Sequence, residues 1–316
     1  MSSRQRVKIY LNLSFPALAA RYARLAADGV GLFRAEFLAL SLGVHPKKLL
    51  AEGGEEAFIR VFADGLREVA RCFWPRPVIF RTLDLKSNEY RGLRGGQEFE
   101  PPEENPALGW RGCRRYVHDP EPFRLQLRAV RRLYAEGWTN IRLMLPFVRT
   151  ISEVLACREI IGEEGLFEIG VPLWLMVEVP SIVFLIEKVL PLAEGVSIGT
   201  NDLTQLILGA DRDNPRLISL WDEQDEAVRC AIERVARACG ERAVECCVCG
   251  DAPSRRPEMV IALLRLGITS LSVSPEAFER VAEIVRESNE KSPWNPDLKC
   301  SFGRSTGGGT RIDTPE

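Results

Sequence analysis

Histidine is scarce in this sequence: only His45 and His118 occur among 316 residues, and neither has other potential metal ligands at useful spacing. Because zinc and iron sites favour imidazole ligands, the sequence argues against such a centre. It also argues against a Ser-His-Asp hydrolase, since Ser197, Ser254 and Ser274 have no histidine to serve as a base. We interpret both histidines as ordinary surface residues on loops.

The sequence also lacks long apolar runs and any strong excess of charge. No run reaches the roughly 18 to 20 residues that span a bilayer, and the first residues lack the apolar core of a signal peptide. The formal charge is −2 and the pI is near 6.0, so the chain as a whole does not attract nucleic acid or anionic membranes. The GGGT of residues 307–310 neither follows a strand nor opens a helix, which argues against a P-loop. We expect a cytosolic protein that binds neither nucleic acid nor membranes.

What is present is a pattern that repeats eight times, in which a short apolar or alternating run precedes a longer helical pattern. The runs cover residues 7–13, 29–36, 77–84, 141–148, 173–179, 195–200, 245–250 and 270–275. Eight β-then-α units predict a (β/α)8 TIM barrel, whose chemistry sits on the loops after the strands. An open, doubly wound sheet is the alternative.

Two segments depart from this rhythm. The connection 85–119, rich in Gly, Pro, Glu and Arg, is interpreted as a functional loop after the third strand, on the mouth of the barrel. Residues 293–316 lose periodicity and gain Gly, Ser and Thr, so we predict a disordered tail there. The prediction is therefore a single barrel domain over residues 1–292, followed by this tail.

Nine cysteines, an odd number scattered through apolar segments, suit a reducing compartment better than a disulfide framework. Three are crowded in VECCVCGDAPS, residues 244–254. The period of a strand sends Cys247 and Cys249 to one side and Cys246 to the other, so they cannot converge on one metal. Cys249 stands last in the predicted strand, where barrel enzymes place catalytic groups.

Polar side chains gather where the predicted strands end. They are Arg34 and Glu36 for the second strand, Arg81 and Asp84 for the third, Glu178 for the fifth, and Asn201 and Asp202 after the sixth. Any one of them is read most simply as a capping or ion-pairing residue on a loop. Their joint placement on one face favours a functional site.

The charges predict the chemistry of that site. Glu178 and Asp202 offer the carboxylate oxygens that suit Mg²⁺. The guanidinium groups that follow strand ends are natural receptors for carboxylate and phosphate, and they belong to Arg34, Arg81, Arg111 and Arg212. Four arginines, two carboxylates and one Mg²⁺ give a charge of +4, which matches a phosphorylated acid of charge about −3.

Seven ordered motifs resemble one family. They are GVGLFRAEFL (29–38), RTLDLKSNEYRGLRGG (81–96), ENPALGWR (104–111), MLPFVRT (144–150), VEVPS (177–181), SIGTNDLTQLILGADRD (197–213) and CGDAPS (249–254). Together they resemble the C-terminal barrel of phosphoenolpyruvate-utilising enzymes, with the closest likeness to phosphoenolpyruvate synthase and a weaker one to pyruvate phosphate dikinase and phosphotransferase-system enzyme I. The resemblance covers residues 6–288.

The resemblance implies a role for each candidate residue. The four arginines would bind the phosphate and carboxylate of phosphoenolpyruvate or pyruvate, and Asn201 would contact the phosphoryl group. Glu178 and Asp202 would hold Mg²⁺. Cys249 would be the acid/base at the methyl or methylene carbon. The implied reaction is phosphoryl transfer between a histidine and the oxygen of pyruvate enolate.

The resemblance also shows what is missing. Family enzymes carry a nucleotide-binding domain and a phosphohistidine domain with a Thr-x-His-type loop, and neither histidine of this chain lies in such a loop. We therefore expect a phosphohistidine on a separate domain or subunit, and a homodimer as a further possible assembly. Two alternatives stay open: a non-catalytic phosphoenolpyruvate-binding regulator, and a lone barrel lyase or aldolase acting on pyruvate-like acids.

Overall fold

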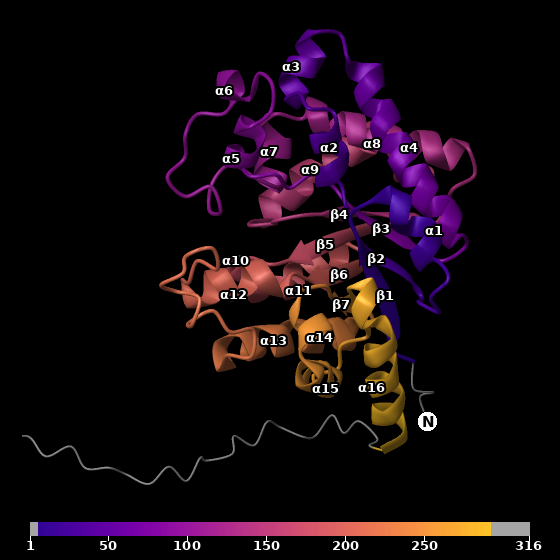
Figure 1. Ribbon diagram of the computed structural model, residues 1–316, viewed down its shortest axis with the longest axis vertical. Coiled ribbons are helices and arrows are strands. Elements are labelled where there is room, and N and C mark those ends of the chain that lie inside the picture. Colours follow the sequence, from indigo (N-terminus) through magenta and orange to yellow (C-terminus); the bar gives the residue numbers. More distant parts are fainter. Residues whose placement is uncertain (1–5, 292–316) are drawn as a thin grey trace, which may run out of the picture.

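Eight parallel strands close into a barrel in the computed structural model, which describes residues 6–291 (Figure 1). The strands are β1 Lys8–Leu13, β2 Gly29–Arg34, β3 Val78–Arg81, β4 Ile141–Leu145, β5 Leu173–Val177, β6 Gly195–Ile198, β7 Glu245–Val248 and β8 Ser270–Val273. Each pairs with the next, and β8 pairs with β1 to close the barrel. The barrel prediction is confirmed, and the open sheet is wrong.

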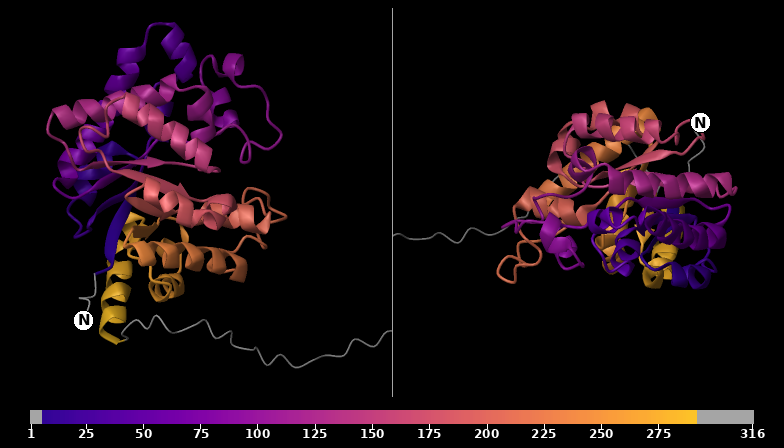
Figure 2. Two further views of the ribbon diagram at one scale, coloured as in Figure 1. Left: turned by 180° about the vertical axis from the view of Figure 1, so that it is seen from behind. Right: turned by 90° about the horizontal axis from the view of Figure 1, so that it is seen from above.

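Helices surround the strands in all views (Figures 1 and 2). They are α1 Ala19–Tyr22, α2 Glu36–Ser41, α3 Pro46–Ala51, α4 Glu55–Phe73, α5 Ser87–Arg91, α6 Gly96–Phe99, α7 Cys113–His118, α8 Glu121–Ala135, α9 Ile151–Glu163, α10 Pro180–Phe184, α11 Ile186–Val189, α12 Thr200–Leu208, α13 Glu226–Arg242, α14 Ala252–Arg255, α15 Pro257–Arg265 and α16 Phe278–Lys291. Side-chain caps mark some of the starts: Thr150 accepts a hydrogen bond from the amide of Glu153 before α9, and Asp225 accepts one from Ala227 before α13.

The strands separate two hydrophobic cores. The outer core fills the space between strands and helices, and it includes Cys246. The inner core lies inside the barrel and consists of Tyr10, Leu32, Ile79, Met144, Trp174, Met176, Cys247 and Cys249. The three crowded cysteines therefore alternate across the sheet as predicted. All eight cysteines of the described range have free thiols.

The connection after β3 is more ordered than the sequence indicates, because it contains α5, α6 and α7. Its Glu100 side chain is buried and is bound by Arg115 and by His45, whose Nε2 lies 3.0 Å from Oε1. The prediction that His45 is a surface residue is wrong, since only 1% of it is exposed. Its partner lies 55 residues away, and no local pattern reveals that contact. His118 is exposed, as predicted.

In Figure 1 the segments around α5 to α7 and around α12 lie on the same side of the molecule, where the strands end. No helix within residues 6–291 is long and apolar enough to cross a membrane. The predicted disordered tail, 293–316, lies outside the described residues.

Candidate active site at the mouth of the barrel

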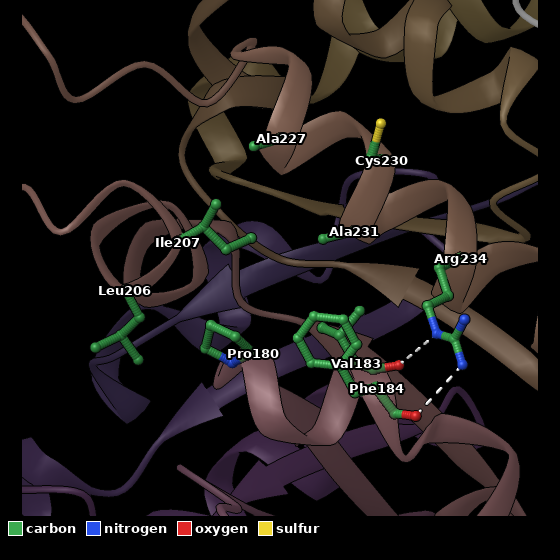
Figure 3. A pocket seen from close by; sticks show the side chains of 9 residues that line it. All are labelled: Pro180, Val183, Phe184, Leu206, Ile207, Ala227, Cys230, Ala231 and Arg234. Carbon is green, nitrogen blue, oxygen red and sulfur yellow. Dashed lines mark hydrogen bonds between the residues drawn. The ribbon is translucent and has the colours of Figure 1, made fainter.

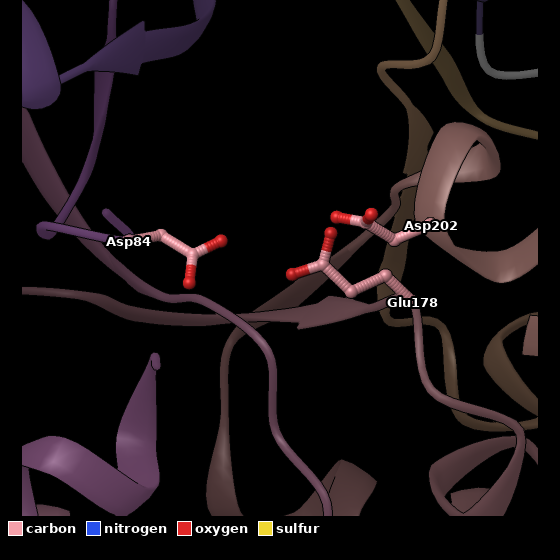
Figure 4. Close-up of side chains that lie close together, drawn as sticks. All are labelled: Asp84, Glu178 and Asp202. Carbon is pink, nitrogen blue, oxygen red and sulfur yellow. The ribbon is translucent and has the colours of Figure 1, made fainter. Parts of the chain in front are cut away.

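Three buried carboxylates face one another at the carboxyl ends of the strands (Figure 4). Asp84 lies in the loop after β3, Glu178 follows β5 directly, and Asp202 lies in the first turn of α12 after β6. One oxygen from each lies within 4.8 Å of the others. Such a set of hard oxygen ligands fits Mg²⁺. Sequence analysis selected Glu178 and Asp202 but left Asp84 without a role.

The Glu178 side chain is held tightly in place. Its Oε1 accepts a hydrogen bond from the Phe147 amide at 2.7 Å. Glycine at position 199 leaves room for this side chain, because a Cβ there would lie 2.7 Å from Oε2 of Glu178. Burial, together with the nearby Asp202 and Asp84, raises the pKa of Glu178 to about 8. A divalent cation would relieve the repulsion that disfavours the ionised form.

Two of the predicted substrate arginines are paired with carboxylates. Arg111 donates to Asp84 through Nε at 3.0 Å and Nη2 at 2.6 Å, and Nη2 also lies 3.2 Å from Asp202. Arg81 donates to Glu36 at 2.8 Å. Burial would raise the pKa of Asp202, but Arg111 and other arginines outweigh it and lower that pKa.

Arg34 and Arg212 differ from this pair, because no hydrogen bond or ion pair of their guanidinium groups occurs among residues 6–291. Burial, and next the neighbouring Arg81, lowers the pKa of Arg34. A partly buried guanidinium without a counterion is a natural receptor for an anionic ligand.

The structure changes the charge balance of the site. Glu36 and Asp84 join the same cluster through Arg81 and Arg111, and neither was included in the charge of +4. With four arginines, four carboxylates and one Mg²⁺, the charge becomes +2. A ligand of charge about −3 therefore still balances the charge of the site to within one elementary charge.

Cys249 lies one residue beyond β7, at the inner wall of the mouth, and 3% of it is exposed. Its amide donates to the Ile198 carbonyl at 3.1 Å, which anchors it beside β6. Burial raises the pKa of its thiol to about 11, against the lowering effect of Ser197. The group is therefore a protonated thiol at neutral pH and can donate a proton.

Asn201 ties the loops after β6 and β7 together. Its Nδ2 donates to Asp251 at 3.1 Å, and the Asp251 amide donates back to its Oδ1 at 3.2 Å. Gly250 lies against Thr200 so closely that a Cβ there would overlap its hydroxyl. The loop that carries Cys249 is thus fixed against the first turn of α12.

Direct contacts join Arg81, Arg111, Glu178 and Asp202 through Asp84, Glu36 and Phe147. Of the other predicted residues, Arg34 ends β2, Asn201 lies in the first turn of α12 and Cys249 directly follows β7. The prediction that Arg212 lies just past a strand end is wrong, because it lies beyond the end of α12. Asp84 was recognisable in the sequence as a strand-end carboxylate, but its nearness to Glu178 was not.

An apolar pocket of about 470 Å³ lies outside the barrel, between α10, α12 and α13 (Figure 3). Its lining consists of Pro180, Val183, Phe184, Leu206, Ile207, Ala227, Cys230, Ala231 and Arg234. The one charged residue in this lining, Arg234, already donates to the carbonyls of Val183 and Phe184. Beside Arg234, the lining offers one thiol, that of Cys230, and neither a carboxylate nor an imidazole.

Residues 1–290 match the model of the PEP-utilising enzyme, PEP-binding domain. The chain is 44% identical over 295 residues to a probable phosphoenolpyruvate synthase of Staphylothermus marinus, covering 90% of this chain and 35% of that protein. It is 42% identical over 287 residues to phosphoenolpyruvate synthase of Pyrococcus furiosus, and the match covers 90% of this chain and 35% of that protein. It is 38% identical over 295 residues to phosphoenolpyruvate synthase of Pseudomonas aeruginosa, and this match covers 85% of this chain and 37% of that protein. The chain thus spans about a third of the length of these relatives.

Proposed function

The chain belongs to the family of PEP-utilising enzymes, and from this premise we propose that it binds phosphoenolpyruvate and pyruvate and exchanges phosphate with a phosphohistidine. The observation that carries the proposal is the mouth of the barrel, where three buried carboxylates adjoin four arginines. Two of those arginines, Arg34 and Arg212, make no hydrogen bond or ion pair to a carboxylate among the described residues. This arrangement suits Mg²⁺ together with a phosphorylated carboxylic acid.

Each residue has a specific task in this proposal. Glu178 and Asp202 hold Mg²⁺, with Asp84 as a third carboxylate beside them. The ion, when bound, supplies electrostatic stabilisation of the enolate and phosphoryl oxygens. Arg34 and Arg212 neutralise the substrate anion.

The paired arginines and Asn201 then set the orientation of the substrate. Arg81 and Arg111 are held by carboxylates on one side, so their geometry is fixed before substrate arrives. Asn201 contacts the transferring phosphoryl group.

Proton transfer falls to Cys249. When the phosphoryl group moves from the enol oxygen to the histidine, the carbon–carbon double bond of the enolate takes up a proton at its methylene carbon. The Cys249 thiol donates that proton, and the product is pyruvate. In the opposite direction the thiolate, which is the minor form at neutral pH, removes a methyl proton and becomes the thiol, and the enolate oxygen accepts the phosphoryl group from the phosphohistidine. The pKa of about 11 keeps the resting thiol protonated.

The phosphohistidine is proposed to come from a separate domain or subunit. His45 is enclosed by Glu100 and by the Tyr90 and Phe99 rings, so it cannot present a phosphoryl group. The relatives are about three times as long as the aligned region, which leaves room in them for further domains. A homodimer stays a prediction, and so does the cytosol as compartment, which the free thiols suit.

The test uses the purified chain, Mg²⁺, phosphoenolpyruvate labelled in its phosphate, and a phosphohistidine-bearing domain taken from one of the relatives. Transfer of label to the histidine domain is expected, and Glu178→Gln is the matched control that should abolish it. Binding of phosphoenolpyruvate without transfer to any such domain would favour a regulator. Turnover without a histidine domain would favour a lyase or aldolase.

A further inference from the structure

The backbone of Phe147 adopts an unusual conformation in the turn between β4 and α9. Its φ is +46°, and Ala243, at the end of α13, is the one other non-glycine residue of the described range with positive φ. For a bulky side chain this region is strained, and such strain concentrates at functional sites. The conformation directs the Phe147 amide to Oε1 of Glu178 at 2.7 Å.

The ring of Phe147 contacts two arginine side chains. The guanidinium carbon of Arg111 lies 4.0 Å from the ring centroid, and that of Arg149 lies 4.4 Å from it. Both distances fit cation–π interactions. Gly112, with φ of +60°, allows the loop after β3 to approach, because a Cβ there would lie 2.6 Å from Cβ of Phe147.

Arg149 completes the arrangement from the other side of the turn. Its Nη1 donates to the Arg111 carbonyl at 3.1 Å, and its Nη2 donates to the Gly109 carbonyl at 2.7 Å. Its guanidinium makes no hydrogen bond or ion pair to a carboxylate among residues 6–291; the nearby Glu153 carboxylate favours its charge, and the like charge of Arg111 opposes it. Placing a half-buried cation there costs free energy. The two carbonyl contacts fix the backbone of Arg111.

We propose that Phe147 and Arg149 are positioning residues that set the substrate arginine Arg111 against the metal ligand Glu178. The backbone of Phe147 orients Glu178, whereas its ring and the Arg149 guanidinium orient Arg111. The inference rests on the proposed function, and it assigns a task to two residues beyond the metal and substrate ligands.

Because Glu178 and Arg111 are held by different contacts of these two residues, substitutions should change phosphoenolpyruvate binding and Mg²⁺ binding to different extents. Arg149→Met removes the hydrogen bonds to the carbonyls of Gly109 and Arg111 but retains the hydrogen bond from the Phe147 amide to Glu178. Phosphoenolpyruvate should therefore bind about tenfold more weakly, since two hydrogen bonds from a charged group are lost. Mg²⁺ should bind within about twofold of the wild type, because its ligands are unchanged.

Phe147→Leu retains the amide and much of the apolar volume but removes the aromatic face. It should also weaken phosphoenolpyruvate binding without a matching loss of Mg²⁺ binding. The two residues act on the same loop, so the double variant should be little worse than either single variant. A merely structural role would instead lower both affinities together, and the losses would add.

The experiment measures Mg²⁺ binding alone and phosphoenolpyruvate binding at saturating Mg²⁺ by titration calorimetry, with thermal unfolding of each variant. The matched control is Arg158→Met, which removes a cation–π contact of 4.8 Å to Phe167 and a bond to the Leu192 carbonyl, in α9 but not at the mouth. If Arg149→Met leaves the phosphoenolpyruvate affinity unchanged, or lowers the affinities for phosphoenolpyruvate and Mg²⁺ equally, this inference is overturned and the proposed function is not affected. Failure of the wild type to bind phosphoenolpyruvate overturns the proposed function and this inference with it. If Arg149→Met does not fold, Phe147→Leu decides the outcome.

Discussion

Arg111 and Asp84 form a two-pronged ion pair inside the mouth of the barrel, with Nε 3.0 Å from Oδ1 and Nη2 2.6 Å from Oδ2. The side chains are 6% and 0% exposed, so water contributes almost nothing to their solvation. The same Nη2 reaches Asp202 at 3.2 Å. One guanidinium therefore holds two carboxylates of the candidate metal site.

Asp84→Asn should destabilise the protein by about 3 kcal/mol, because removal of one partner leaves a buried guanidinium with less compensation. Urea unfolding of the metal-free protein measures the change. Asp64→Asn is the matched control: Asp64 also pairs with an arginine, Arg67, but its side chain is 60% exposed, so its loss should cost less than about 1 kcal/mol. Equal effects of the two substitutions would contradict this account of the pair.

Binding of Mg²⁺ should release about one proton near pH 7, because the pKa of Glu178 is raised to about 8 and the ion requires the carboxylate. Calorimetric titrations in two buffers of different ionisation enthalpy measure the number of protons. Below pH 8 the apparent Mg²⁺ affinity should fall about tenfold per pH unit. Glu178→Gln should release no proton; release that persists in this variant would assign the titrating group elsewhere.

The same pKa predicts how the stability of the metal-free protein depends on pH. A carboxyl whose pKa is higher in the folded state binds its proton more tightly there than in the unfolded chain. Its contribution to stability is complete below about pH 4.5, the ordinary value, and is lost as pH rises through about 8. Thermal unfolding should show that Mg²⁺ stabilises the protein more at pH 9 than at pH 6.

Cys249→Ala should lower the exchange of pyruvate methyl protons with D2O by at least about 100-fold, because the proposed proton donor is lost. Phosphoenolpyruvate binding should remain, since the thiol supplies no charge to the anion. Cys247→Ala is the matched control, because Cys247 is also buried in the inner core. Exchange that survives in Cys249→Ala at the level of the control would exclude the role assigned to Cys249.

Glu100→Leu should destabilise the protein by about 3 kcal/mol, because Arg115 and His45 lose the carboxylate that they share. Glu98→Leu, two residues earlier, changes a carboxylate that is 56% exposed and should have a small effect. Chemical unfolding compares the two. If Glu100→Leu unfolds like the wild type, this buried contact does not stabilise the connection after β3.

Much of the fold could be predicted, because its signals are local. A strand that is buried on both faces appears as a short apolar run, and all eight runs contain a strand of the barrel. The period of two also placed Cys246 and Cys247 on opposite sides of the strand, and the structure puts Cys246 in the outer core and Cys247 in the inner one. The ends of the strands differ from the predicted ends by a few residues. Glu36, for example, was predicted to lie in a strand but is the first residue of α2.

The candidate site could be predicted less completely. Parallel strands end on one face of a barrel, so the sequence indicated which charged residues gather at the mouth. It did not indicate that Asp84 would join Glu178 and Asp202, or that Glu36 would neutralise Arg81. These contacts depend on the relative angles and distances of loops that are far apart in the chain.

The sequence by itself therefore determined the barrel, the face that carries the charged side chains and the family likeness, since each depends on local periodicity or on ordered motifs. Only the tertiary structure decided which charged side chains form ion pairs with one another and that His45 is buried against Glu100. It also decided how Phe147 and Arg149 contact Arg111. Pairing energies depend on separations of a few ångströms and on exclusion of water, and these are set when distant segments pack together.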